Sequence, residues 1–68
     1  MTNTALLRQR IKDSGLKLQY IADYIGISRV SLTMKIENVS EFRQTEIKKL
    51  CEILRIETAE EKTLIFLE

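Results

Sequence analysis

The chain has 68 residues, of which 44% are hydrophobic, 31% charged and 6% aromatic, a composition typical of one compact domain and too mixed for a disordered segment. With no histidine and a single cysteine, Cys51, it offers neither a Cys/His zinc site nor an intrachain disulfide, and it lacks the nucleophile–base pair or phosphate loop of an enzyme. Residues 1–40 hold six basic against three acidic residues and residues 41–68 hold five against seven, which suits a polyanion on one side, although two solvated helix faces would give the same asymmetry.

Two glycines divide the first part of the chain into two predicted helices. Leu7 and Ile11 recur one turn apart between about residues 3 and 14, and Gly15 supplies the left-handed conformation that ends a helix. A second, shorter helix follows, because an apolar stripe at helical spacing runs up to Gly26. The members of this stripe are Leu18, Ile21, Ala22 and Ile25.

The third predicted helix begins directly after this glycine. Ser28 can cap it through its hydroxyl, and Leu32 and Ile36 lie one turn apart on its inner face. The helical periodicity then lapses over residues 37–44, where we expect a loop.

The remaining residues predict a fourth helix and a short fifth one. The fourth has apolar residues at the spacing of one helix face, namely Ile47, Leu50, Cys51 and Leu54. Thr58 and Glu61 form a capping box for the fifth, which reaches an apolar run over residues 64–67. That run could equally be a short edge strand, a dimer interface or a segment folded into the core. The whole pattern predicts an all-α fold, a compact orthogonal bundle of about five short helices forming a single domain over residues 1–68.

The second and third helices carry the most informative pattern. They meet at Gly26 through a turn of three to four residues, and so tight a turn forces two helices to cross steeply. Ala22 is small enough for the helices to touch there, and glycine adopts the positive φ that such a turn favours. We expect Leu32 to pack over Ala22 in the angle between the helices. This spacing predicts a helix-turn-helix.

Residues along nearly the whole chain also carry a family resemblance: Gly15-Leu16, Ile21-Ala22, Gly26-Ile27-Ser28-Arg29, Leu32, Lys35-Ile36, Asn38, Phe42, Glu46-Ile47, Glu61-Lys62 and Ile65-Phe66. In these residues the sequence resembles the Cro/repressor-type (Xre-like) helix-turn-helix regulators of bacteriophages, and in particular their short Cro-like members. The resemblance implies a lambda-repressor-like domain that binds duplex operator DNA sequence-specifically, usually as a homodimer, and regulates transcription.

Candidate base contacts follow from the geometry of the third helix. With Leu32 and Ile36 inward, a rotation of about 100° per residue turns other side chains outward. These are Val30, Thr33 and Met34, with Arg29 at the exposed start of the helix. In the family the matching positions enter the major groove, where an arginine can donate to guanine O6 and N7 and a methyl group suits the thymine methyl. If Val30 and Met34 were core residues instead, the helix would be apolar nearly all round.

A second set of polar residues suits phosphates, which hold register without reading sequence: Lys17, Gln19, Ser28, Lys35, Asn38 and Arg43. The chain departs from the family pattern at two of these. The glutamine that commonly meets a phosphate at the start of the second helix is Leu18 here, and Gln19 stands one place later. The expected Ser or Thr cap of the fourth helix is Arg43, which cannot cap but can reach a phosphate.

The sequence therefore predicts a phage or prophage repressor that binds double-stranded DNA as a homodimer. No apolar run approaches the ~18 residues of a membrane span, and the basic N-terminal segment is unlike a signal peptide, so we expect a cytoplasmic protein without cofactor, metal or small-molecule substrate. The alternative is a small helical protein-interaction module that docks through its apolar C-terminal tail. The third helix favours DNA, since it has two basic and no acidic residues between Ile27 and Ile36.

Overall fold

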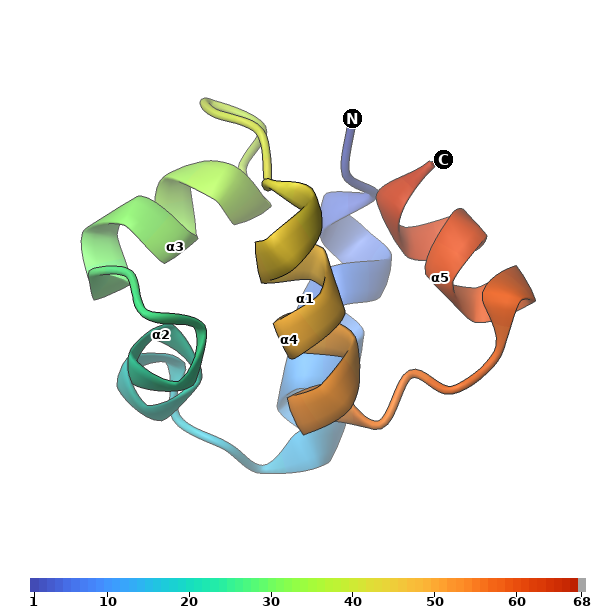
Figure 1. Cartoon of the computed structure of the whole chain (residues 1–68), viewed down its shortest axis with the longest axis horizontal. Helices are drawn as coiled ribbons and strands as arrows, with labels where there is room; N and C mark the ends of the chain where they lie inside the picture. The colour runs from blue at the N-terminus through green and yellow to red at the C-terminus, as the bar shows by residue number, and fades with distance from the viewer. Residues whose placement is uncertain (68) are drawn as a thin grey trace.

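Residues 1–67, which the computed structural model describes, form five short helices joined by tight turns and one longer loop (Figure 1). Their bounds are α1 Thr4–Ser14, α2 Leu18–Ile25, α3 Arg29–Ile36, α4 Gln44–Leu54 and α5 Ala59–Phe66. The bundle measures 27 × 24 × 21 Å along its principal axes. The predicted all-α fold and the order of its helices are confirmed.

The local signals read from the sequence end α1 and α2 and begin α3 and α5. Gly15 and Gly26 adopt left-handed φ values of 71° and 93° after α1 and α2. A Cβ at Gly26 would meet no atom within 4 Å, so the backbone angle rather than space favours glycine there. Asn3, Ser28 and Thr58 each cap a helix, because the side-chain oxygen accepts the N–H three residues on, at 3.2, 3.0 and 3.1 Å.

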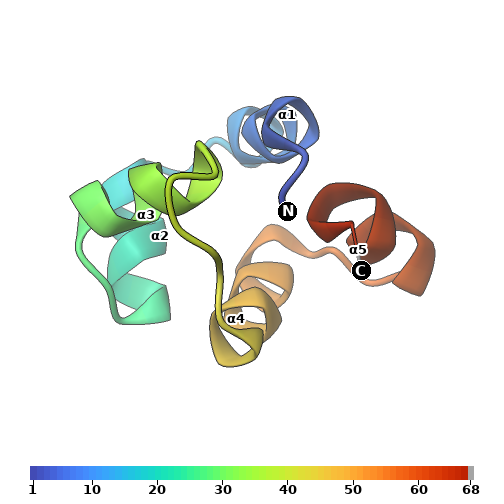
Figure 2. The ribbon, with the colours of Figure 1, turned by 90° about the horizontal axis from the view of Figure 1, so that it is seen from above.

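The helices are arranged with α1 and α4 in the middle of the bundle. Figures 1 and 2 show α2 and α3 on one side of this pair and α5 on the other. In agreement with these views, α2 packs against α3 and α4, and α5 packs against α1. None of the described helices is long and apolar enough to cross a membrane. The helix-turn-helix therefore occupies one end of the molecule.

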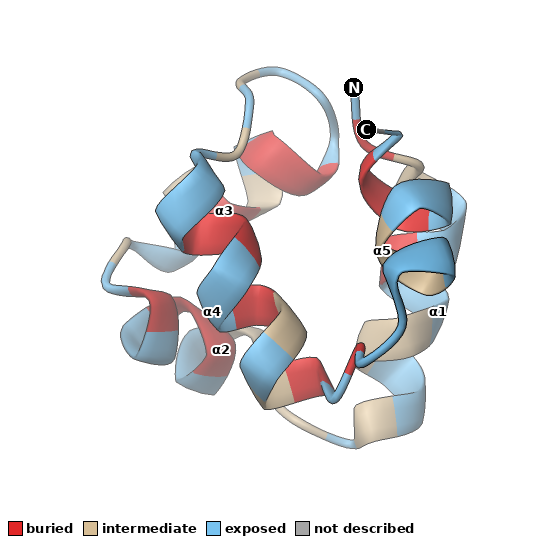
Figure 3. Cartoon of the chain, turned by 45° about the vertical axis from the view of Figure 1, so that its right-hand side comes forward, coloured by how far each residue is buried: buried red, intermediate tan, exposed pale blue. Residues whose placement is uncertain are grey.

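The core draws on all five helices. Figure 3 shows buried stretches of each helix turned inward and exposed stretches turned to the surface. The buried apolar residues are Leu7, Ile21, Ala22, Ile25, Leu32, Ile36, Ile47, Leu50, Leu54, Ile56, Ile65 and Phe66. Most residues of the apolar stripes predicted for the first four helices thus meet inside, while Ile11, Leu18 and Cys51 are only partly buried against this core.

The apolar run near the C-terminus is helical and divides between core and surface. Ile65 and Phe66 are buried, and the Phe66 ring meets Phe42 edge to face, with ring centroids 5.8 Å apart. Leu64 and Leu67 remain 60% and 55% exposed. Of the three possibilities left open by the sequence, the strand is wrong. The two buried residues belong to the chain's own core, and only the two exposed leucines remain for an interface.

Candidate nucleic-acid interface

The junction between α2 and α3 has the predicted helix-turn-helix geometry. Three residues, 26–28, separate the two helices. The Ala22 carbonyl accepts hydrogen bonds from the Gly26 and Ile27 N–H groups at 2.8 and 3.0 Å, which turns the chain sharply. Ala22 and Leu32 are both fully buried where the helices pack together. The glycine thus has the predicted left-handed backbone, and Ala22 and Leu32 are buried as expected on the two helices that pack together.

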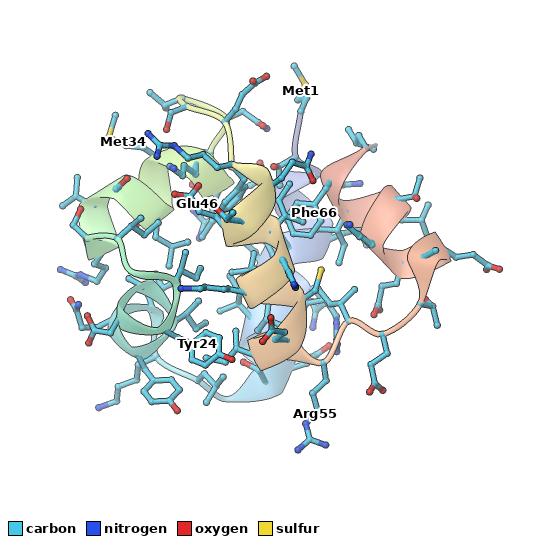
Figure 4. All side chains as sticks on the ribbon, in the orientation of Figure 1. Met1, Tyr24, Met34, Glu46, Arg55 and Phe66 are labelled. Atoms are coloured by element: carbon cyan, nitrogen blue, oxygen red, sulfur yellow. The ribbon has the colours of Figure 1, made fainter. Side chains whose placement is uncertain are left out.

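The outer face of α3 gathers the four candidate base contacts. Arg29, Val30, Thr33 and Met34 line one shallow hollow on this helix. Val30 is 67% and Met34 41% exposed, so neither is a core residue. Figure 4 shows Met34 projecting away from the body of the molecule. The hydroxyl of Thr33 donates to the Arg29 carbonyl at 3.0 Å, which leaves its methyl group free to point elsewhere. The structure therefore presents these four side chains together on the outer surface of α3, where Thr33 is half-buried and the other three are exposed.

Three of the candidate phosphate contacts lie at the starts of α2 and α3. Lys17 is the exposed N-cap of α2 and makes no side-chain capping bond. Gln19 is also exposed, and its amide nitrogen donates to Asp23 Oδ1 one turn along, at 2.8 Å. Ser28 is exposed at the start of α3, where its oxygen accepts the Ser31 N–H and its hydroxyl proton remains available to a phosphate.

The fourth, Arg43, is the exposed N-cap of α4. Its side chain cannot accept a backbone N–H, and the capping interaction runs the other way: Glu46 Oε1 accepts the Arg43 N–H at 2.8 Å. The guanidinium makes no capping bond to the helix, and its charge helps to hold the pKa of Glu46 below its ordinary value. Contact between Arg43 and a phosphate remains a prediction.

The structure contradicts the prediction for Lys35. Its ammonium lies 2.6 Å from Glu46 Oε1, and the side chains are only 11% and 9% exposed. Residue 35 stands beside Ile36 at the edge of the buried stripe, so its stem follows the core and its charge meets a carboxylate of α4. Burial alone raises the pKa of Glu46, but the bonds from the Arg43 N–H and the Lys35 ammonium outweigh burial and hold the pKa below its ordinary value. Lys35 therefore does not face a phosphate.

Asn38 is also a correction, because its side chain serves the fold. This residue has a left-handed φ of 64° in the loop after α3. Its Oδ1 accepts the Thr2 N–H and its Nδ2 donates to the Thr2 carbonyl, both at 2.8 Å. Thr4 Oγ1 donates to the Ile36 carbonyl at 2.6 Å. These bonds tie the end of α3 to the N-terminal segment and occupy both polar groups of the asparagine.

Two further basic residues counted in the predicted basic half are also paired inside the chain. Arg8 forms an ion pair with Glu37, and Arg10 lies 3.5 Å from Glu61 and donates to the carbonyls at the end of α4. The sequence alone gives no sign of these partners, which lie 29 and 51 residues away. Among residues 1–67, no group of His, Cys, Asp or Glu side chains gathers in a way that could hold a metal ion. The cationic surface offered to DNA is therefore smaller than the count of basic residues suggests.

The comparisons with known proteins agree with this geometry. A family model described as Helix-turn-helix matches residues 7–60, which include the whole of α2, the turn and α3. Neither the curated proteins nor the solved structures gave a match. The family match covers well over half of the chain and includes each buried residue at the α2–α3 junction. The chain therefore belongs to the helix-turn-helix family of DNA-binding transcription regulators.

Proposed function

We propose that this chain is a sequence-specific repressor of phage or prophage origin, which acts in the cytoplasm as a homodimer and places α3 in the major groove of its operator. The observation that carries the proposal is the outer face of α3, where Arg29, Val30, Thr33 and Met34 share one exposed hollow. An α-helix with its side chains is about 10–12 Å across, and the major groove is about 12 Å wide. An exposed helix with such a surface fits that groove.

The four side chains supply complementary kinds of base recognition. Arg29 is a rigid fork of donors, which matches the two acceptors of guanine in the major groove. Val30 presents an exposed methyl surface, and Thr33, which also carries a methyl group, lines the same hollow. Such groups suit the thymine methyl, while Met34 adds a flexible apolar contact. The proposal therefore assigns hydrogen-bonded readout to one residue and shape or methyl readout to three.

Phosphate contacts would come from the starts of three helices, α3 itself and its neighbours α2 and α4. Lys17 and Gln19 lie at the start of α2, Ser28 at the start of α3, and Arg43 at the start of α4. Each is exposed, and helix starts add favourable backbone dipoles for an anion. Contacts from three elements would fix the orientation of α3 without reading the sequence.

A homodimer is part of the proposal because an α3 of eight residues reads only a few base pairs. Leu64 on α5 and Leu67 directly after it are exposed, and Leu6 on α1 is exposed as well. Since α5 lies across the bundle from α2 and α3, pairing through it would leave both α3 helices free (Figure 2). Two such helices would read half-sites about 34 Å apart. The protein-docking alternative loses its main support, because Ile65 and Phe66 fill the chain's own core.

A mobility-shift assay tests the proposal, with duplexes from either side of the chain's own gene and random-sequence duplex as competitor. We expect a shifted band that survives excess competitor. Val30→Glu adds a carboxylate to the exposed face of α3 and should abolish the band, while Lys62→Ala, a loss of charge on α5, should leave it. A band unaffected by Val30→Glu would contradict the role of α3, and the absence of any band would contradict the repressor function.

A further inference from the structure

A buried ion pair joins the last turn of α3 to the first turn of α4. Lys35 Nζ lies 2.6 Å from Glu46 Oε1, with both side chains almost fully removed from solvent. The same oxygen accepts the backbone N–H of Arg43 at 2.8 Å. Figure 4 shows Glu46 in the interior between the two helices. One carboxylate oxygen thus holds both the end of α3 and the residue that begins α4.

The packing of the bundle leaves this junction to few contacts. The main packing partners of α3 are α2 and α1, and those of α4 are also α2 and α1. Between α3 and α4 the chain runs through the loop of residues 37–43, which folds back on α3 through the Val39 N–H and the Met34 carbonyl, at 2.8 Å. The ion pair crosses this gap directly. The ion pair therefore helps to set the position of the start of α4 relative to α3.

Stability alone is a poor reason for such a pair. Burying two charges costs several kcal/mol per ion, and apolar residues of similar volume stabilise a core as well or better. What charged hydrogen bonds supply and apolar contacts do not is direction, because the donor must point at the acceptor oxygen. At this junction the Lys35 ammonium and the Arg43 N–H both donate to Glu46 Oε1, so the positions of the two donors are fixed relative to the same atom.

We propose that Lys35 and Glu46 are positioning residues, which set Arg43 relative to the outer face of α3 so that base and phosphate contacts form together on one duplex. The inference rests on the proposed function, in which α3 reads bases and Arg43 meets the backbone. Without the pair, each kind of contact can still form, but not both in register on a specific site. Random DNA offers phosphates along its whole length, so non-specific binding tolerates a displacement of Arg43 relative to α3.

The test compares the parent chain with Lys35→Met/Glu46→Leu, which replaces the ion pair by apolar side chains of similar size. The probes are a duplex that the parent enriches from a random-sequence pool and an unselected duplex, at a temperature where circular dichroism shows both proteins folded. We expect the double variant to melt no lower than the parent. It should lose about tenfold in affinity for the enriched duplex, the scale of one good base contact. On the unselected duplex it should stay within about twofold.

Glu46→Gln is the conservative variant. Its Oε1 can still accept the Arg43 N–H and a bond from Lys35, whose long stem can bring the ammonium toward water. We expect it to keep most of the preference for the enriched duplex, even where it melts at a lower temperature. A preference as fully lost as in the double variant would overturn the positioning role, because the acceptor geometry would then not be what matters.

Glu61→Gln serves as the matched control. It breaks the ion pair between Arg10 and α5, on the side of the bundle away from α3, and should lower stability without changing the preference. Unchanged preference in Lys35→Met/Glu46→Leu, or an equal loss in Glu61→Gln, would overturn the inference while the repressor function stands. A parent chain that enriches no sequence from the pool overturns the proposed function, and this inference with it.

Discussion

Individual basic side chains have two different tasks in this molecule. Arg8, Arg10 and Lys35 each meet a carboxylate on another part of the chain, and so hold elements together. Lys17 and Arg29 stay on the surface around α2 and α3. The division bears on DNA binding, because a cation already paired with a carboxylate of its own chain contributes less than an unpaired one to phosphate contacts.

Arg29 should set sequence choice. On the preferred duplex, Arg29→Ala should cost about 1–3 kcal/mol, because a guanidinium that donates twice to guanine is lost, and little on random DNA. Lys17→Ala is the control and should weaken both duplexes by about the same factor. Fluorescence anisotropy with labelled duplexes measures both. An equal loss on both duplexes for Arg29→Ala would make this arginine another phosphate contact, and would leave base reading to Val30, Thr33 and Met34.

Glu46 should make the fold sensitive to acid. Its folded pKa lies below the ordinary value of 4.5, so its stabilising contribution is present above that value and is lost as pH falls through the folded pKa. The urea midpoint of the parent should therefore fall more steeply between pH 5 and about pH 3 than that of Glu46→Gln, which has no carboxyl to protonate there. Parallel curves for the two proteins would show that Glu46 does not contribute this dependence.

Among the elements, α5 belongs to the core of the bundle. Its packing against α1 and the ring contact of Phe66 with Phe42 close the end of the bundle away from α3. The N-terminal segment joins it there, since the Asn3 N–H donates to the Ile65 carbonyl at 2.6 Å. The two ends of the bundle thus differ in role. The helix-turn-helix presents an exposed surface, and the end formed by α1 and α5 completes the core.

Phe66→Ala should destabilise the monomer by about 3–5 kcal/mol, since it empties a buried aromatic site in a small domain. Leu64→Ala, on the exposed face of the same helix, should barely change the melting temperature but should weaken the dimer on DNA. Thermal melting and analytical ultracentrifugation separate the two effects. A Phe66→Ala protein that melts like the parent and only loses dimerisation would place this ring in an interface instead of the core.

The elements themselves were predictable because their signals are local. Gly15, Gly26 and the cap Ser28 act within one turn of chain, and the spacing of Leu32 and Ile36 already turns Val30 outward. The four consecutive apolar residues at the end of α5 and just after it have no period, so the sequence could not tell the buried face of this helix from its exposed one. Contacts between elements could not be predicted from the sequence either. Lys35 meets a carboxylate 11 residues away, and only the assembled bundle shows that the two lie in contact.

For the molecule as a whole, electrostatics should be a modest part of binding. The net charge is +1, and three of the six basic residues before position 41 are paired within the chain. With Lys17 and Arg43 as the exposed cations assigned to phosphates, we expect roughly two neutralised phosphates per subunit, each contributing about −0.9 to the slope of log affinity against log salt. Anisotropy titrations across a salt series measure this slope. A flat response would remove the phosphate contacts from the proposal.

The central claim, that the outer face of α3 lies in the major groove, is tested most directly by methylation interference on the duplex that the parent enriches. Guanine N7 lies in the major groove and adenine N3 in the minor groove, so the two methylated positions report the two grooves separately. We predict that methylation of one guanine N7 in each half-site blocks the parent chain, and that Arg29→Ala binding no longer responds to that guanine. Interference at adenine N3 alone would contradict the claim.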